Sequence, residues 1–213
     1  MRINKFLSSL GIASRRAIDK YIEEGRIKVN GVIASTGIDV TEDDEIYIDN
    51  KKIETKRIEE KVYFMLNKPL EVLSASSDDR GRKTVVDLIK TDKRIFPIGR
   101  LDYMTSGLIL LTNDGELFNR LVHPKSEIYK KYYIKVFGEV KKEEIEELKK
   151  GVLLEDGKTL PAKISGIKYD KNKTSMYISI REGRNRQIRR MIEKFGYKVL
   201  MLRREKIGEL SLG

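Results

Sequence analysis

The segment Gly99–Gly107 constrains the fold of this chain more than any other feature. It places one carboxylate, Asp102, two residues after Arg100 and between two apolar stretches, Ile95–Ile98 and Leu108–Leu111. The apolar stretches predict two strands, and the glycine at each end of the loop lets backbone and ligand approach closely. Loops that a rigid sheet positions often carry catalytic groups. The segment therefore predicts a sheet-containing domain with a reactive carboxylate in a strand connection.

The charge balance selects the kind of partner. Lys and Arg (44) outnumber Asp and Glu (33), so the formal net charge is +11. Such an excess favours a polyanion, either nucleic acid or an anionic membrane surface. No apolar run approaches the roughly 20 residues that span a bilayer, and the N-terminus lacks the apolar segment of a signal peptide. We therefore expect a cytoplasmic monomer that binds nucleic acid and no membrane.

The chain has no cysteine and a single histidine, His123. Disulfides, thiol nucleophiles, thiolate metal sites and multi-histidine metal clusters are therefore excluded, and we expect no metal. A serine triad would depend on that one histidine. Enzymatic chemistry is expected to use Asp, Glu, Lys, Arg or Tyr side chains instead.

Local patterns divide the chain into two domains and a linker. Residues 1–53 predict two short helices that end at Gly11 and Gly25, then an Asn30-Gly31 hairpin and a last strand. Residues 54–61 are mostly charged and predict a linker. Residues 62–213 predict an α+β domain, with a mainly antiparallel or mixed sheet flanked by helices. The expected strands are 62–66, 108–112, 132–136, 162–167 and 175–180, and the expected helices are 85–89, 116–121, 142–150 and 186–195.

Basic residues gather in the first domain. Arg15 and Arg16 are expected in the first turn of the second helix, after an N-cap at Ser14, where helix N–H groups also favour a phosphate. Arg26 and Lys28 begin the hairpin that is expected to pack beside this helix. Either these residues form one cationic surface for an RNA backbone, or they are ordinary solvated charges on a small domain.

The first domain resembles the S4 RNA-binding domain of ribosomal proteins and RNA-modifying enzymes. The segments that carry the resemblance are Arg2, Lys5, Ser14–Ala17 and Gly25–Gly31. The resemblance implies RNA as the ligand. The residues that it implies for RNA binding are Arg2, Lys5, Ser14, Arg15, Arg16, Arg26, Lys28 and Asn30.

Four segments of the second domain resemble a group of ribosomal RNA pseudouridine synthases, the small-subunit type-A and large-subunit type-B enzymes. They are the loop Gly99–Gly107, Tyr63–Pro69, Lys130–Gly138 and Arg181–Met191, in the order and spacing of that group. The resemblance therefore implies an S4 domain followed by a pseudouridine synthase domain. The segments Val136–Val140 and Gly151–Gly157 are more similar to the large-subunit type-B enzymes, which favours 23S over 16S rRNA as substrate.

The resemblance also implies the reaction and the residue roles. Uridine becomes pseudouridine when its N1–C1′ bond breaks, the base turns over and C5 bonds to C1′, so no cofactor is needed. Asp102 is implied as nucleophile or base, and a basic residue, Arg189 or in second place Arg184, is implied to pair with it. Tyr132 would stack on the uracil and bring its hydroxyl near C5. Arg100 would fill the gap that the flipped-out base leaves, with Arg184 as a further substrate contact.

The chain departs from the family pattern after Asn67-Lys68-Pro69. The family usually has a glycine two residues further on, where this chain has Glu71. The implied partner is rRNA, free or in a ribosome-assembly intermediate. The alternative is a non-catalytic rRNA-binding or ribosome-assembly factor, in which the Asp102 loop has no chemical role.

Overall fold

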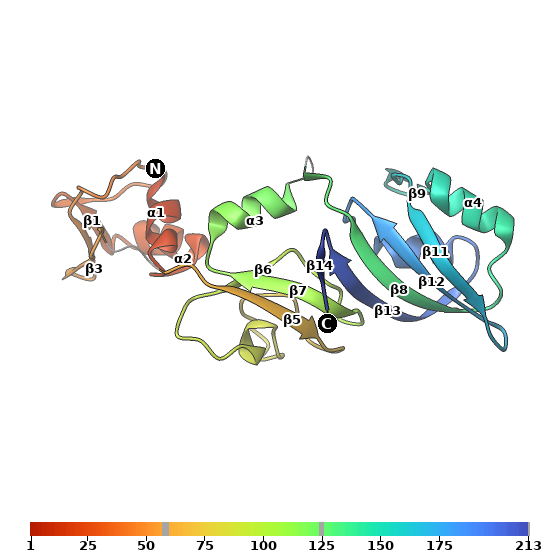
Figure 1. Ribbon diagram of the computed structural model, residues 1–213. Helices are drawn as coiled ribbons and strands as arrows, with labels where there is room; N and C mark the ends of the chain where they lie inside the picture. Colours follow the sequence, from red (N-terminus) through yellow and green to blue (C-terminus); the bar gives the residue numbers. More distant parts are fainter. Residues whose placement is uncertain (57–59, 124–125, 213) are drawn as a thin grey trace. The chain divides into compact units, whose positions relative to one another are not determined.

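The computed structural model describes residues 1–56, 60–123 and 126–212. The chain forms two compact units, the first built from Met1–Val62 with Thr91–Arg94 and Asn113–Gly115. The second unit holds the remaining residues (Figure 1). Residues 57–59 of the expected linker and the chain end at 213 lie outside the described residues. In the described part, no helix is long and apolar enough to cross a membrane.

In the first unit, two helices pack on a small antiparallel sheet. The elements are α1 (Ile3–Ser9), α2 (Arg15–Glu23), β1 (Ile27–Val29), β2 (Val32–Ile33), β3 (Ile46–Ile48) and β4 (Lys51–Lys52), with strand order β2-β1-β3-β4. The predicted cap is confirmed, because the Ser14 hydroxyl accepts a hydrogen bond from the Ala17 N–H at 3.1 Å. The predicted hairpin is also confirmed, with positive φ at both Asn30 and Gly31, as a type I′ turn requires.

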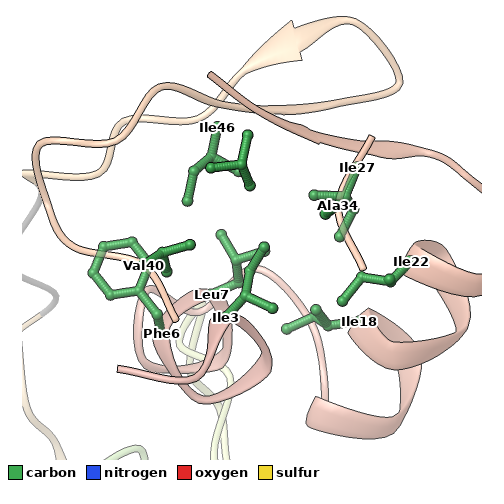
Figure 2. Packing of buried hydrophobic residues seen from close by; sticks show 10 residues of the cluster. Ile3, Phe6, Leu7, Ile18, Ile22, Ile27, Ala34, Val40 and Ile46 are labelled. Carbon is green, nitrogen blue, oxygen red and sulfur yellow. The ribbon is translucent and has the colours of Figure 1, made fainter. Parts of the chain in front are cut away.

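Apolar side chains from the helices and strands fill the core of this unit. Ile3 and Leu7 lie one helical turn apart on α1 and meet Ile18 of α2 and Ile27 and Ile46 of the strands (Figure 2). Burying such a side chain contributes roughly 1.5–3 kcal/mol, so these contacts hold the helices on the sheet.

A mixed eight-stranded sheet forms the centre of the second unit. Its order is β11-β12-β8-β13-β7-β5, with β14 beside β13 and β6 beside β7 (Figure 1). Among the described pairs of strands only β13–β7 is parallel, which confirms an α+β fold with a mixed sheet. The strands are β5 (Tyr63–Lys68), β6 (Phe96–Ile98), β7 (Ser106–Thr112), β8 (Lys130–Phe137), β11 (Lys163–Tyr169), β12 (Lys173–Ile180), β13 (Lys198–Ile207) and β14 (Leu210–Ser211).

The other elements of the second unit are helices and one hairpin. They are η1 (Val86–Leu88), α3 (Gly115–Val122), α4 (Lys142–Lys150), β9 (Leu153–Leu154), β10 (Gly157–Lys158) and α5 (Gln187–Glu193). The predicted helix at 142–150 matches α4 residue for residue. The expected helix at 85–89 is wrong, because only a single 3-10 turn forms there, with the Asp87 carboxylate accepting from the Thr84 N–H at 2.8 Å.

One face of the sheet is the core of the second unit. Ile134 and Val136 on β8 and Met176 and Ile178 on β12 are fully buried, whereas the residues between them are partly exposed. Alternate residues of a strand point to opposite faces, so this alternation identifies the buried face. Tyr132 shares the face of Ile134, which places it under the elements that cover the sheet.

Candidate active site

The Asp102 loop is fixed on both sides of the aspartate. The Ser74 hydroxyl accepts from the Leu101 N–H at 3.0 Å and donates to the Leu101 carbonyl at 2.9 Å. The Glu71 N–H donates to the Tyr103 carbonyl, and the Thr105 N–H donates to the carbonyl of Asp102, each at 2.9 Å. The half-buried Asp102 carboxylate itself has no hydrogen bond or ion pair with the described residues. The backbone is therefore anchored while the carboxylate remains available to a substrate.

The backbone conformation of Glu71 shows why the family usually has glycine at this position. Its φ is 59°, in the left-handed region that glycine adopts without strain. The chain thus keeps the turn with a residue that is less suited to it. The turn matters because Glu71 is one of the residues that hold the Asp102 loop.

Arg189 of α5 holds the same loop from the other side. Its side chain is buried, and Nη2 donates to the Met104 carbonyl at 2.6 Å and lies 3.5 Å from the Thr105 hydroxyl. Burial, with the charge of Arg186, holds the pKa of Arg189 below its ordinary value, and the charge of Asp102 opposes that shift. The predicted direct pairing with Asp102 is not seen among the described ion pairs. Arg189 instead binds the loop backbone and acts on the carboxylate through longer-range attraction.

Lys68 is a site residue to which the sequence reasoning gave no role, although the Asn67-Lys68-Pro69 motif was its signal. It ends β5 opposite Gly107 of β7, its side chain is fully buried, and Nζ donates to the Pro69 carbonyl at 2.9 Å. Burial lowers the pKa of Lys68 to about 8, and the nearby charge of Asp102 opposes that shift. Asp102 therefore lies within electrostatic range of two buried cations, Lys68 and Arg189.

Lys68 is expected to make the free energy of unfolding rise with pH between about 8 and 10.5. Its folded pKa is about 8 and its ordinary value is 10.5, so in this window the unfolded chain binds more protons than the folded one. Urea unfolding of wild type and Lys68→Met at pH 8 and pH 9.5 measures this effect. The wild type should gain about 1.5 kcal/mol relative to the variant over that interval. An equal pH dependence for both proteins would show that Lys68 titrates normally.

A pocket of about 80 Å³ brings the predicted residues of the second domain together. Asp102, Arg100, Tyr132 and Arg184 all line it, and its apolar lining includes Ile180, Ile188 and Leu202. Arg189 lies behind the loop and not in the lining. Within residues 1–56, 60–123 and 126–212, no group of three or more histidine, aspartate and glutamate side chains could hold a metal ion.

Tyr132 offers its ring and hydroxyl to this pocket. Its side chain is 8% exposed, and its hydroxyl makes no hydrogen bond with the described residues. Tyr133 lies on the opposite face, where its ring meets that of Tyr177 at 5.6 Å between centroids. Of the two adjacent tyrosines, only Tyr132 shares the pocket with Asp102.

The two pocket arginines differ in how free they are. The Arg184 guanidinium donates to the carbonyls of Gly157 at 3.0 Å and Lys158 at 2.7 Å and to the Glu182 carboxylate at 3.1 Å. These bonds anchor the β9–β10 hairpin and leave few donors for a substrate. The Arg100 side chain is exposed and makes no hydrogen bond with the described residues.

The predicted RNA-binding residues of the first unit also fall into two groups. Lys5, Arg15 and Arg16 are exposed and form no ion pair with the described residues. Arg26, in contrast, forms ion pairs with Asp49 at 2.5 Å and Glu24 at 3.1 Å. The Asn30 side-chain amide donates a hydrogen bond to the Asp44 carboxylate and accepts one from the Glu45 N–H. Arg2 lies 3.9 Å from Asp39, Lys28 lies 3.5 Å from Asn50, and Ser14 caps α2. Of the predicted RNA-binding residues, the cations without a described ion pair that remain available to RNA are therefore Lys5 on α1 and Arg15 and Arg16 in the first turn of α2.

Two family models match the chain, one for each unit. The RNA pseudouridylate synthase model matches residues 62–194, and the S4 domain model matches residues 1–46. The chain therefore belongs to the RNA pseudouridylate synthase family, and it is an RNA-binding enzyme that isomerises uridine to pseudouridine. The resemblance found in the sequence is confirmed.

Individual relatives match over almost the whole chain. Ribosomal large subunit pseudouridine synthase B of Bacillus subtilis is 50% identical over 99% of this chain and 87% of that protein. An uncharacterized RNA pseudouridine synthase of Aquifex aeolicus is 45% identical over 100% of this chain and 86% of that protein. A crystal structure of a pseudouridylate synthase superposes with a TM-score of 0.69 at 32% identity, covering 100% of this chain and 91% of that chain.

Proposed function

We propose that the chain converts one specific uridine of 23S rRNA to pseudouridine, with Asp102 as the essential carboxylate. The observation that carries the proposal is that the Asp102 carboxylate, which pairs with none of the residues that the structure describes, shares one pocket with Tyr132. The relative from Bacillus subtilis, named for the large ribosomal subunit, supports the choice of rRNA. The proposal includes a cytoplasmic monomer that acts without metal or cofactor on rRNA or a ribosome-assembly intermediate.

The proposed roles follow from the reaction and from the residues in and around the pocket. The N1–C1′ bond breaks, a C5–C1′ bond forms, C5 loses a proton and N1 gains one, so atoms and electrons balance within the nucleotide. Asp102 acts as nucleophile or base in this exchange, and Lys68 and Arg189 keep negative charge favourable at its position. Tyr132 stacks on the uracil with its hydroxyl toward C5, and the exposed Arg100 fills the gap left by the flipped base.

Arg184 acts in this proposal as a positioning residue. Its bonds to the Gly157 and Lys158 carbonyls hold the β9–β10 hairpin, and they bring the same residue to the pocket lining. The role implied by the family, a direct substrate contact, would have to use the donors that these bonds leave.

Arg15 and Arg16 bind RNA phosphates in this proposal, because both are exposed at the N-terminus of α2 and have no carboxylate partner among the described residues. Replacing both with alanine is expected to weaken binding of an rRNA transcript. The slope of log affinity against log salt should also become shallower by about 1–2. Titrations at several salt concentrations measure the slope, and an unchanged slope would rule out phosphate contacts by these residues.

The function is tested by chemical mapping of pseudouridine in rRNA from cells with and without the protein. One 23S position should lose pseudouridine in the deletion strain and regain it when the wild-type gene is restored. A 16S position that responds instead would correct the substrate. If no rRNA position responds, the proposal of an rRNA substrate is wrong.

A further inference from the structure

Two cations flank Tyr132 on the pocket face of the sheet. Arg204 of β13 is paired directly with Tyr132, and Lys130 precedes Tyr132 by two residues on β8. Cross-strand partners, and residues two apart on a strand, have side chains on the same face. Ile180, which is paired with Lys130, and Leu202, two residues before Arg204, both line the Asp102 pocket. Lys130 and Arg204 are not in the pocket lining themselves, but they lie on the same face of the sheet as residues that are, and next to them.

Arg204 is a buried cation with donors left over. Its side chain is 3% exposed, and Nε donates to the Leu108 carbonyl at 2.6 Å. Its Nη2 is buried and has no hydrogen-bond partner in the described chain. A guanidinium carries five N–H donors, and a buried one is normally matched by a carboxylate or another anion. None of the ion pairs seen in the described residues supplies that anion to Arg204.

Lys130 adds a second charge of the same sign. Burial lowers the pKa of the half-buried Lys130, and the charge of Arg204 lowers it further, so the two cations lie close enough to repel each other. No carboxylate pairs with Lys130 in the described part of the chain. The next residue, Lys131, differs because it lies on the opposite face with Nζ 4.3 Å from the Tyr177 ring. Folding gains nothing from two repelling cations, whereas an anionic ligand would offset both charges.

We propose that the partly exposed Lys130, with the positive charge of the buried Arg204 added to its own, forms a phosphate subsite for a phosphodiester of the RNA next to the uridine held at Tyr132. The inference rests on the proposed function, because it takes the Tyr132 pocket as the uracil site. A charge-assisted hydrogen bond from a lysine to a phosphate oxygen is short and strong. Such contacts position a nucleic acid without reading its sequence, so this subsite would set the depth at which the nucleotide enters.

The subsite is tested by RNA binding in the full chain carrying Asp102→Asn, which separates binding from chemistry. In that background, Lys130→Met should weaken binding of a 23S rRNA transcript by about tenfold at moderate salt. It should also reduce the salt slope by about 0.7–0.9, the contribution of one phosphate contact. Lys130→Arg should keep the slope, and Lys131→Met, the neighbour on the opposite face, should leave both values unchanged.

Urea unfolding shows whether these variants fold. Lys130→Met should unfold at the same or a higher urea concentration, because it removes one of two repelling charges. Lys130→Gln serves as a second variant if the methionine protein does not fold. A slope that is unchanged in both folded variants would overturn the subsite, and so would an equal loss in Lys131→Met. Failure of the proposed function gives a different result, in which wild-type protein forms no pseudouridine on rRNA although the Lys130 slope change is present.

Discussion

Asp102→Asn is expected to reduce pseudouridine formation by at least about 10⁴-fold, because Asp102 is the only carboxylate among the described residues that line the pocket. Asparagine has the size of aspartate but carries neither its charge nor its reactive oxygen. The loop should survive the change, since Ser74, Glu71 and Arg189 hold backbone atoms of the loop and not the Asp102 carboxylate. Single-turnover conversion of a uridine-containing rRNA transcript measures the loss.

Binding and a matched aspartate supply the controls for this variant. RNA affinity should be nearly unchanged in Asp102→Asn, because phosphate contacts provide most of the binding energy. Asp79→Asn alters an exposed carboxylate of the same unit and should convert the transcript at the wild-type rate. If Asp102→Asn binds RNA and still converts it at a similar rate, the assignment of Asp102 is wrong. If it no longer binds RNA, its role is in binding.

Gly107→Ala is expected to destabilise the second unit by about 4 kcal/mol or more. Gly107 has φ of 105°, and a Cβ atom there would lie 2.2 Å from the Arg204 carbonyl oxygen and 2.6 Å from the Arg204 nitrogen. Both are backbone atoms of the neighbouring strand, so β7 and β13 would have to separate. Their pairing joins the Asp102 loop to the sheet that carries Tyr132, so activity should be lost with stability.

Gly99→Ala is the matched control, at the other end of the same loop. Gly99 also has a positive φ, 73°, but a Cβ atom there would meet nothing within 4 Å. Its cost is therefore the left-handed backbone alone, about 1 kcal/mol. The free energies of unfolding of the two variants, measured with urea, separate the cost of the left-handed backbone from the cost of the contact with the Arg204 backbone. Equal destabilisation would show that the close approach of β7 and β13 is not what requires glycine at position 107.

The elements that were predictable bury residues at a regular spacing. Helix α4 buries Ile145 and Leu148 on one side and ends before Gly151, whose φ is 89°. Strand β12 buries every second residue from Thr174 to Ile180. In both segments the buried residues recur at the spacing of the element, three along the helix and two along the strand, so the local pattern and the tertiary structure agree.

Strand β13 was not predicted because its buried positions are not all apolar. Leu202 and Arg204 are its buried residues, and the buried Arg204 interrupts the alternation that marks a half-buried strand. The helix expected at 186–195 is also shorter in the structure, and the backbone at Arg186 explains its first residue. Arg186 has a left-handed φ of 47°, so α5 begins one residue later, at Gln187. The helix ends at Glu193, two residues before the expected end.

The candidate site shows a similar division. The motifs identified Asp102, Tyr132 and Arg100, which lie in one pocket. They could not show that Arg189 binds the Met104 carbonyl 85 residues away, or that Lys68 is fully buried beside Asp102. Both facts depend on the packing of β5, β7 and α5, and no local pattern encodes that packing.

The central claim is that Asp102 carries out an exchange at C5 and C1′ of one uridine. It is tested most directly by tritium release from an rRNA transcript labelled at C5 of uridine, because pseudouridine formation removes that hydrogen. Wild-type protein in excess over the transcript should release one equivalent per target site, and Asp102→Asn should bind the same RNA and release none. Release by the folded variant at a rate near that of the wild type would contradict the account.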